Sequence, residues 1–337
     1  MSNNLSLREK IVDCLDSSYL NLIILPTEKC NFRCTYCYED FEKGRLKKET
    51  AIGIKKLIEK RISDLSELEI SWFGGEPLLE KEIILEISNF ALKKSKSVSS
   101  CIYRGDITTN AFLLNIELFK QLYEANIRFF QISLDGDEHL HNLTRRHANK
   151  SGTFNTIWEN LLRMKETKLN FTVLLRVHFS AATVNDLDVL VRQIDESFGG
   201  DLRFKVKFKN IEKLGGVNDY MIKPLSDKEI LNHKKKLESM VKHKENLYIE
   251  PDNEPYICYA ARANSLVIRS DGSLAKCTVG LNDPINSIGY INDAGEISIN
   301  TNYNIWLEGL ISQDTSFLEC PYHVLKKRKP SDVPLAL

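Results

Sequence analysis

The sequence predicts an α/β protein in which a parallel sheet curls into a partial (β/α)6 barrel, followed by a small domain of β-hairpins. Two observations predict this fold class. Over about the first 210 residues, apolar runs typical of strands alternate with amphipathic stretches typical of helices. After that point the chain becomes highly charged and then turns into short, turn-rich segments. Because βα units connect with one hand, a series of them can form a partial barrel.

Six apolar runs are the predicted strands: Leu20–Leu25, Leu68–Phe73, Tyr103–Thr108, Arg128–Leu134, Phe171–Phe179 and Leu202–Phe208. The predicted helices lie between them: Lys48–Ser63, Glu80–Ser95, Asn115–Ala125, Phe154–Thr167 and Val184–Phe198. In parallel α/β sheets, the chemistry gathers at the carboxyl ends of the strands. Functional residues are therefore expected in the segments that directly follow these strands.

The last third of the chain has a different pattern. Leu225–Glu245 is highly charged and is predicted to be a solvated connecting helix. Beyond Pro251, two hairpins are predicted with turns at Asp271-Gly272 and Asn292–Gly295, and a short helix over Ile305–Leu310. The predicted organisation is an N-terminal segment (1–19), the barrel (20–224), the connecting helix (225–250), and the small domain with the C-terminal tail (251–337).

Composition and charge exclude several classes of protein. The 337-residue chain carries 46 Lys and Arg against 46 Asp and Glu, so its formal net charge is zero, whereas nucleic-acid-binding proteins normally have a basic surplus. No apolar run approaches the ~20 residues needed to cross a bilayer. Met1–Lys10 is polar and lacks the apolar core of a secretion signal. We therefore expect a cytoplasmic protein whose partners are neither nucleic acid nor membrane.

The most informative residues are cysteines. Of the eight in the chain, Cys30, Cys34 and Cys37 are crowded into eight residues that follow the first predicted strand. In a reducing compartment, such clustering points to metal binding or catalysis. Thiolates are the preferred ligands of iron–sulfur clusters, and three of them leave the fourth iron of a cubane open to an external ligand. A zinc site is the alternative, but a structural zinc site normally has four ligands. The nearest histidine in sequence, His139, is far from the three cysteines.

The segment Thr27–Glu39, with its C-x3-C-x2-C spacing and with Phe32 and Tyr36 between the cysteines, resembles the signature of the radical S-adenosylmethionine superfamily. Trp72–Leu78, at the end of the second strand, resembles the family's GGEP motif, and the resemblance extends over at least Leu20–Phe179. It implies a TIM-like partial barrel, a 4Fe–4S cluster on the three cysteines, and bound S-adenosylmethionine. In the family, the glycine backbone receives the methionyl amino group, because glycine permits close approach.

Two further segments carry the resemblance. Thr109-Asn110 follows the third strand where the family shows a TNG sequence, although Ala111 replaces the glycine. Ser133–Gly136 and His141–Arg145 resemble a stretch of anaerobic sulfatase-maturating enzymes and radical peptide maturases, with Asn142 in place of an aspartate. The resemblance implies these contacts to S-adenosylmethionine: Tyr36, Gly74, Gly75, Glu76, Pro77, Asn110, Ser133, Asp135, Arg145 and Arg176.

Two of these contacts have alternatives. Arg145 and Arg176 compete for the ligand's carboxylate, which suits the two parallel donors of a guanidinium, and either could instead belong to a structural ion pair.

The resemblance also implies a second, auxiliary cluster. Gly272-x4-Cys277 matches an element of the family's SPASM/Twitch extensions, and the C-x18-C-x42-C spacing of Cys258, Cys277 and Cys320 resembles a Twitch domain with one auxiliary 4Fe–4S cluster. His323 stands in the fourth slot. It is either a ligand or an ordinary surface histidine beside a basic tail, and the iron could also stay open to substrate.

Two cysteines match no motif. Cys14 and Cys101 are predicted to be structural, with Cys101 as an alternative hydrogen-atom donor.

The function implied is that of a radical S-adenosylmethionine oxidoreductase, which cleaves its cofactor to a 5′-deoxyadenosyl radical that takes hydrogen from a substrate. The resemblance favours a maturase that crosslinks, epimerises or oxidises a ribosomally synthesised peptide or forms a thioether in it. An electron would come from a flavodoxin or ferredoxin. Only residues 1–19 precede the first strand, so a leader peptide would need another docking site or a separate leader-binding protein.

Two alternatives remain. One is a dehydrogenase of a small molecule such as an aminoglycoside precursor. The other is a non-catalytic iron–sulfur electron carrier, which the Gly74–Pro77 and Ser133–Gly136 segments disfavour because a carrier needs no pocket for a nucleotide-like ligand.

Overall fold

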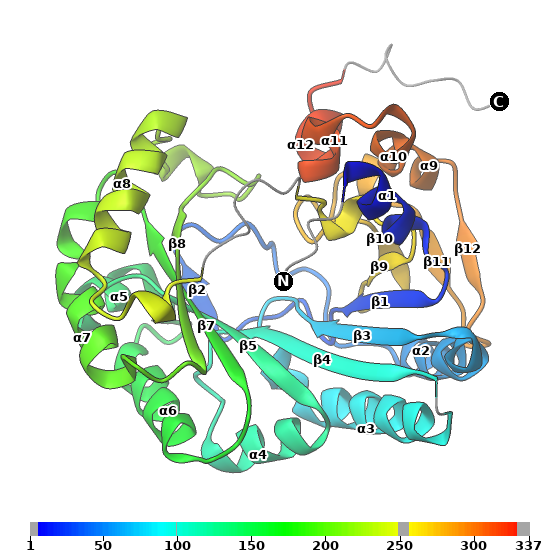
Figure 1. The fold of residues 1–337 in the computed structure, drawn as a ribbon, viewed down its shortest axis with the longest axis horizontal. Coiled ribbons are helices and arrows are strands. Elements are labelled where there is room, and N and C mark those ends of the chain that lie inside the picture. The colour runs from blue at the N-terminus through cyan, green and yellow to red at the C-terminus, as the bar shows by residue number, and fades with distance from the viewer. Residues whose placement is uncertain (1–5, 99, 249–255, 329–337) are drawn as a thin grey trace.

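The computed structural model, which describes residues 6–98, 100–248 and 256–328, confirms the predicted α/β class. A curved 10-stranded sheet runs through the molecule in the order β12-β11-β10-β9-β1-β3-β4-β5-β7-β8 (Figure 1). Its parallel part contains the six predicted strands: β1 (Tyr19–Ile24), β3 (Glu67–Trp72), β4 (Ile102–Thr109), β5 (Ile127–Leu134), β7 (Thr172–Phe179) and β8 (Phe204–Asn210).

Helices cover the outer face of this curved sheet (Figure 1). They are α2 (Lys48–Arg61), α3 (Lys81–Ser97), α4 (Ile116–Glu124), α6 (Phe154–Glu166), α7 (Asp188–Phe198) and α8 (Asp227–Met240). Helix α4 illustrates why they form where predicted. Asn115 caps it by accepting a hydrogen bond from the Leu118 amide at 2.9 Å, and Leu118, Phe119 and Leu122 form its buried stripe. None of the helices in the described ranges combines the length and the apolar character needed to cross a membrane.

Successive side chains of each strand face opposite sides of the sheet, one side toward the apolar core and the other toward the barrel interior. In β3, Leu68, Ile70 and Trp72 are fully buried in the core between the sheet and the helices. Ser71 points to the opposite side, because successive side chains of a strand face opposite sides of the sheet. The outer face is therefore an apolar core, and the inner face is left for polar residues.

The C-terminal hairpins continue the barrel's own sheet. Strand β9 (Ser265–Ile268) pairs in parallel with the free edge of β1, from Asn21 opposite Ser265 to Ile24 opposite Ile268. The antiparallel strands β10 (Ser273–Ala275), β11 (Gly289–Ile291) and β12 (Ile297–Ile299) extend it further. Both predicted hairpins are present. The predicted boundary at residue 251 lies outside the described residues, so the division into domains stays a prediction.

Several elements were not predicted. Helix α1 (Leu7–Leu15) begins at a Ser6–Glu9 capping box within the expected N-terminal segment. Strand β2 (Phe32–Cys34) pairs with β6 (Arg145–His147), just after α5 (Glu138–Thr144). In place of one short helix near the C-terminus there are four: α9 (Asn302–Trp306), α10 (Glu308–Ser312), α11 (Thr315–Glu319) and α12 (Pro321–Leu325). Single 3-10 turns occur at Ile62–Asp64, Pro77–Glu80, Val184–Asp186, Asp219–Met221, Lys244–Asn246, Tyr259–Ala261 and Pro284–Asn286.

The packing of α2 on the second hairpin generates the first prediction. A Cβ at Gly53 in α2 would lie 2.1 Å from the backbone oxygen of Asn292 in the β11–β12 turn. Alanine in a helix interior normally stabilises by about 1 kcal/mol relative to glycine. At this position we expect Gly53→Ala to lower the free energy of unfolding by about 1–3 kcal/mol, because backbone would have to move.

Denaturant unfolding measures this difference. Gly44→Ala is the matched control, since nothing lies within 4 Å of a Cβ built there. A Gly53→Ala protein as stable as the parent would contradict the close helix–turn contact.

Candidate functional site

A cavity of about 190 Å³ lies at the carboxyl ends of the parallel strands, where the sequence predicted the site. The loop after β1 brings Cys30, Cys34 and Cys37 into its wall. Most of the other predicted contacts line the same cavity: Tyr36, Gly74, Gly75, Asn110, Ser133, Arg145 and Arg176. The fold therefore brings these residues together around one space, although their individual roles stay predictions.

The three thiols suit an iron–sulfur cluster. Burial raises the pKa of Cys30 and Cys34, and burial together with Cys34 raises that of Cys37 to about 12. Buried thiols of this kind ionise only beside a strong positive charge, such as iron supplies. Within the described chain, no three His, Cys, Asp or Glu side chains converge closely enough to hold one metal ion. The ligands of a cubane bind different irons, so they need not converge on a single ion.

The two glycines after β3 are required by close packing. Gly74 has φ +117°, and a Cβ there would lie 2.2 Å from the Thr27 carbonyl oxygen. A Cβ at Gly75 would lie 2.5 Å from the Lys29 carbonyl oxygen. The glycine edge thus lies directly against the cysteine loop, and it leaves the backbone bare toward the cavity.

Glu76 and Pro77 lie behind the cavity wall and do not line it. Glu76 is fully buried, and its carboxylate accepts hydrogen bonds from Thr109 Oγ1 at 2.6 Å and from the Asn110 amide at 2.7 Å. Pro77 begins a buried 3-10 turn. Glu76 therefore joins the ends of β3 and β4. Asn110 itself lines the cavity, and its Nδ2 donates to Asn31 Oδ1 at 2.8 Å.

The two positions that depart from the family pattern have local explanations. Ala111, in the place of a glycine, adopts φ +59°, a conformation that costs free energy for any residue with a Cβ. Its carbonyl accepts a hydrogen bond from Asn160 Nδ2 at 2.9 Å. Asn142, in the place of an aspartate, accepts hydrogen bonds from the Thr153 and Phe154 amides at 2.7 and 3.1 Å, and so caps the start of α6.

A buried polar network orients Arg145. Its Nη1 donates to the Tyr36 hydroxyl at 2.8 Å, which in turn donates to Asp135 Oδ1 at 2.9 Å. Thr144 Oγ1 and His178 Nδ1 also contact the Asp135 carboxylate, at 2.8 and 3.2 Å. Burial disfavours the charged form of Asp135, but the His178 hydrogen bond and the Arg145 charge outweigh it, so its pKa lies below the usual range. Asp135 therefore supports the cavity from behind.

Arg145 lines the cavity without a carboxylate partner. The residue is buried, and its Nε is a fully buried atom that has no hydrogen-bond partner. Among the described side chains, neither Arg145 nor Arg176 forms an ion pair with a carboxylate. A cavity-lining guanidinium that forms no ion pair suits an anionic ligand group such as a carboxylate, because buried polar groups are normally satisfied.

A second cavity, of about 580 Å³, fills the barrel interior next to the first. Both cavities are lined by Phe73, Thr108, Arg176, Lys209 and Asn210. Closed barrels are usually filled here by branched apolar side chains, whereas this interior presents Asn21, Ser71, Asp106 and Gln131 on β1, β3, β4 and β5. Tyr256, Tyr259 and Thr278 of the C-terminal part also line it. We call this cavity the barrel chamber.

The barrel chamber contains two acceptor groups that sequence reasoning missed. Asn21 is only 6% exposed, and its Oδ1 has no partner. Asp106 Oδ2 accepts a hydrogen bond from Ser71 Oγ at 2.6 Å, while burial and the charge of Glu69 raise the pKa of Asp106 to about 7. The sequence signal that could have identified both residues is a polar side chain at an inward-facing position of a strand.

The auxiliary-site cysteines lie near enough to one another to interact electrostatically. Cys258 stands at the start of a 3-10 turn, Cys277 follows β10, and Cys320 precedes α12. Burial, with smaller effects of the neighbouring cysteines, raises the pKa of Cys258 to about 11 and of Cys277 to about 12. The His323 amide donates to the Cys320 carbonyl at 3.1 Å, which places the histidine one turn beyond. Metal binding by these four residues stays a prediction.

Neither of the remaining cysteines lines the two cavities. Cys14 packs in a small apolar cluster with Ile11 and Leu310. Cys101 is buried just before β4, at the amino end of that strand, while the cavity is at its carboxyl end. A strand of this length spans about 25 Å, so the position of Cys101 argues against a role as hydrogen-atom donor.

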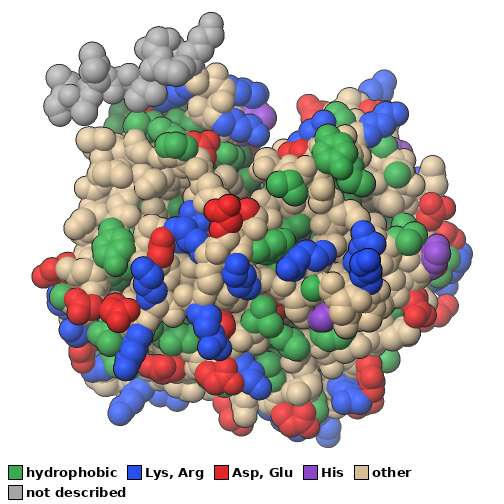
Figure 2. Space-filling view, turned by 180° about the vertical axis from the view of Figure 1, so that it is seen from behind, with side chains coloured by type: hydrophobic (Ala, Val, Ile, Leu, Met, Phe, Trp, Pro, Cys, Tyr) green, Lys and Arg blue, Asp and Glu red, His purple; other side chains and the backbone are tan. Residues whose placement is uncertain are grey.

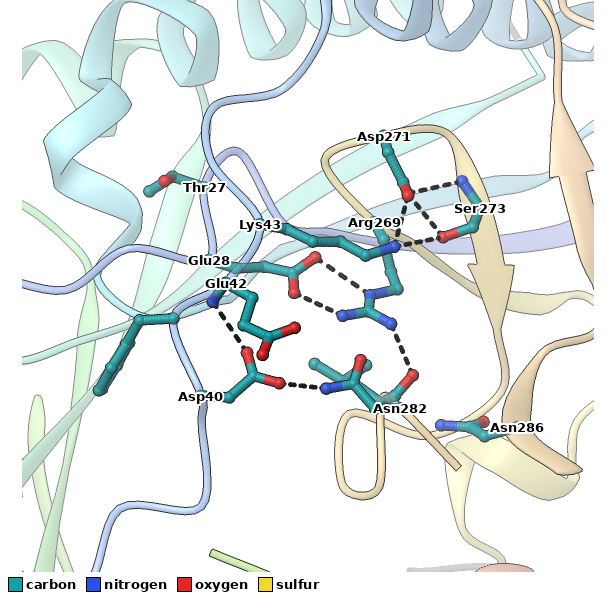
Figure 3. A network of polar contacts seen from close by, with 12 residues as sticks. Thr27, Glu28, Asp40, Glu42, Lys43, Arg269, Asp271, Ser273, Asn282 and Asn286 are labelled. Carbon is teal, nitrogen blue, oxygen red and sulfur yellow. Dashed lines mark hydrogen bonds and ion pairs between the residues drawn. The ribbon is translucent and has the colours of Figure 1, made fainter. Parts of the chain in front are cut away.

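A polar clamp holds the cysteine loop to the first C-terminal hairpin (Figure 3). Arg269 Nε and Nη2 donate to Glu28 Oε1 and Oε2 at 3.1 and 2.6 Å, and both residues are buried. Arg269 Nη1 donates to the Leu281 carbonyl at 2.6 Å. Two outer contacts, Lys43 with Asp271 and Asn282 with Asp40, flank the pair. The loop that carries the three cysteines is thus fixed from outside the barrel.

Comparison with known proteins places this site in a family. Residues 24–194 match the radical SAM superfamily. A cysteine-type anaerobic sulfatase-maturating enzyme of Clostridium novyi is 32% identical over 169 residues, 47% of this chain and 44% of that enzyme. A GTP 3′,8-cyclase of Acaryochloris marina is 30% identical over 179 residues, 51% of this chain and 50% of that cyclase. The matches thus span about half the length of these curated relatives.

Solved structures share the fold. Native anSMEcpe with bound AdoMet and the Kp18Cys peptide has a TM-score of 0.64 at 19% identity, covering 92% of this chain and 86% of that one. Streptococcus suis SuiB bound to the precursor peptide SuiA has a TM-score of 0.62 at 15% identity, covering 96% of this chain and 76% of that one. At these identities the likeness concerns the fold alone.

The ionisation of Asp106 generates a second prediction. Its folded-state pKa of about 7 lies above the ordinary value of about 3.9. The folded protein therefore holds this proton more tightly than the unfolded chain, and the free energy of unfolding should fall as pH rises from about 4 to 7. We expect Asp106→Asn to remove this loss, raising stability at pH 8 by up to about 4 kcal/mol relative to the parent, with little difference near pH 4.

Denaturant unfolding at both pH values measures the effect. Asp13→Asn, which removes an exposed carboxyl group, is the matched control. An Asp106→Asn protein with the parental pH profile would show that Asp106 is not held in a desolvated site.

Proposed function

This chain belongs to the radical SAM superfamily, and on that premise we propose that Cys30, Cys34 and Cys37 hold a 4Fe–4S cluster with which it cleaves S-adenosylmethionine. When bound and reduced, the cluster supplies the electron for this cleavage, and the 5′-deoxyadenosyl radical that results takes hydrogen from a substrate. One observation carries the proposal. Three cysteines share a cavity with a bare glycine backbone and with Arg145, which forms no ion pair with a carboxylate among the described side chains.

The residues around the cavity have separate tasks in this proposal. The Gly74–Gly75 backbone accepts the ligand's amino group, and Arg145 binds its carboxylate. Tyr36 and Asp135 keep the guanidinium in place through their hydrogen bonds, so they position rather than contact the ligand. Ser133 and Asn110 face the cavity from the ends of β5 and β4, where they can bind hydroxyl groups. Enclosure by the barrel keeps water from the reacting atoms.

We propose that the substrate is a peptide and that the reaction is a crosslink, thioether formation, epimerisation or oxidation. The sulfatase-maturating relative and the peptide-bound anSMEcpe and SuiB structures support this class. The barrel chamber supports it as well, because its polar walls adjoin the cofactor cavity and could receive one side chain of a longer molecule. A separate leader-binding protein would be a further partner.

An auxiliary cluster on Cys258, Cys277 and Cys320, with His323 as a candidate fourth ligand, completes the proposal. Tyr259, next to Cys258, lines the barrel chamber, and so does Thr278, next to Cys277. A cluster there would stand beside the substrate, where it could accept the electron left after hydrogen abstraction or hold the substrate. Protein bearing Cys277→Ala should then contain about four fewer irons per chain than the parent.

Anaerobic reconstitution tests the central claim. With dithionite and S-adenosylmethionine, the protein should produce 5′-deoxyadenosine, and Cys34→Ala should abolish both this product and the iron and sulfide of one cluster. Cys14→Ala, which changes a buried cysteine that does not line the cofactor cavity, is the matched control. Zinc in place of iron, or a cubane with four protein ligands and no product, would refute the proposal. A peptide encoded beside the gene should become modified; a sugar converted instead would favour the small-molecule alternative.

Loss of the Arg145 contact should weaken cofactor binding. A hydrogen bond to a charged group contributes about 1.5–3 kcal/mol, so Arg145→Gln should raise the Kd for S-adenosylmethionine by about 10- to 150-fold. Titration calorimetry on the reconstituted protein measures it, with Arg163→Gln on the surface of α6 as the control. An unchanged Kd would transfer the role to Arg176.

A further inference from the structure

One exposed face next to the cysteine loop carries two uncompensated positive charges. Arg33 on β2 and Arg146 on β6 stand directly opposite each other in the short ladder, and both are exposed. Like charges in this arrangement repel. Arg33 donates to the Cys30 and Phe32 carbonyls at 2.8 and 2.6 Å. Arg33 also lies over the Phe41 ring, with its Cζ 4.8 Å from the ring centre. Within the described ranges, no carboxylate forms an ion pair with either arginine.

Apolar side chains stand beside these arginines. Val217, Tyr220 and Met221 are 82%, 80% and 61% exposed. Single exposed apolar residues are ordinary, but three within five residues form a patch of the kind that marks interaction sites. A Cβ at Gly216 would lie 2.4 Å from the Cys37 carbonyl oxygen, so this segment lies directly on the cysteine loop.

A groove of about 290 Å³ joins the arginines to this patch and leads to the cluster site. Arg33, Arg146, Val217 and Met221 line it, and so do Cys34 and Cys37, which also line the inner cavity. The two cysteines therefore border the groove as well as the inner cavity. A protein seated on the outside would stand next to two of the three cysteines without entering the inner cavity. Glu39 is the carboxyl group of this groove, and its Oε1 is buried.

Resting on the proposed function, we propose that this face docks an acidic, low-potential one-electron carrier protein such as a flavodoxin or ferredoxin. We call it the docking face and define it by Arg33, Arg146, Val217, Tyr220 and Met221. Charge complementarity selects an acidic partner, because its carboxylates would neutralise the arginine pair. A small apolar centre with a charged rim suits a transient contact. Electron transfer weakens steeply with distance, so contact beside Cys34 and Cys37 favours reduction of the cluster there.

The test compares a protein reductant with a small one. Arg146→Glu and Tyr220→Ser, singly and together, should raise the KM for flavodoxin in 5′-deoxyadenosine formation, by about tenfold or more in the double variant. The rate with dithionite should stay within about twofold of the parent, because dithionite needs no docking face. Higher salt should weaken flavodoxin binding to the parent more than to the Arg146→Glu variant. Arg163→Glu and Ile311→Ser, both on exposed helix positions elsewhere, are the matched controls.

A direct binding measurement tests the docking face independently of catalytic turnover. The Kd between oxidised flavodoxin and the reconstituted protein, measured by calorimetry, should rise in parallel with the KM. Equal losses with dithionite and flavodoxin would overturn the inference, since the face would then shape the cluster site itself. Unchanged Kd and KM values would place the carrier elsewhere, and a changed peptide KM with dithionite would make this a substrate surface. If the parent formed no 5′-deoxyadenosine at all, the proposed function would fail while the Kd still tested the docking face.

Discussion

The buried pair of Glu28 and Arg269 connects the two halves of this protein. Glu28 belongs to the cysteine loop, and Arg269 follows β9, the strand that completes the edge of the barrel sheet. Both charged groups are buried, and the two parallel hydrogen bonds between them offset the free-energy cost of removing the charges from water (Figure 3). Removal of one partner from such a pair typically costs about 3–5 kcal/mol. The cysteine loop thus owes its position to the C-terminal hairpin as much as to β1.

The short two-stranded ladder of β2 and β6 also positions the cysteine loop, from inside the site. Its register sets Cys34 opposite Arg145, so one pairing brings a thiol and the guanidinium to the same cavity. The Tyr36–Asp135 hydrogen bond then fixes the guanidinium from behind. On the outer side, the same ladder carries Arg33 and Arg146. A few backbone hydrogen bonds therefore organise both faces of the cysteine loop.

On the face of the molecule opposite to that of Figure 1, basic, acidic and hydrophobic side chains are interspersed over the surface (Figure 2).

The sequence predicted the barrel strands and helices well because their signals are local. Alternating or continuous apolar runs such as those of β3 and β7 depend only on neighbouring residues. Long-range pairings left no such signal. The union of β9 with β1 and the ladder of β2 with β6 join segments far apart in the chain, and three-residue strands are too short to show a period. Helix α1 was missed although its Ser6–Glu9 capping box is visible in the sequence.

The sequence predicted which residues gather at the candidate site, but not which of them line the cavity and which lie behind its wall. Family resemblance selected Glu76, Asp135 and Arg145 alike, yet only Arg145 lines the cavity, because a motif does not tell which side of the backbone a side chain occupies. Asp106 and Asn21 escaped notice since a polar residue in a strand is equally compatible with exposure to solvent.

The parallel pairing of β1 with β9 also has a consequence for the order of synthesis. β1 leaves the ribosome well before β9, the strand that covers its outer edge, because all the other parallel strands of the barrel are made between them. Until then, β1 presents a row of free amide and carbonyl groups, which is a template for pairing with other chains. The nascent barrel would thus need shielding of that edge throughout translation.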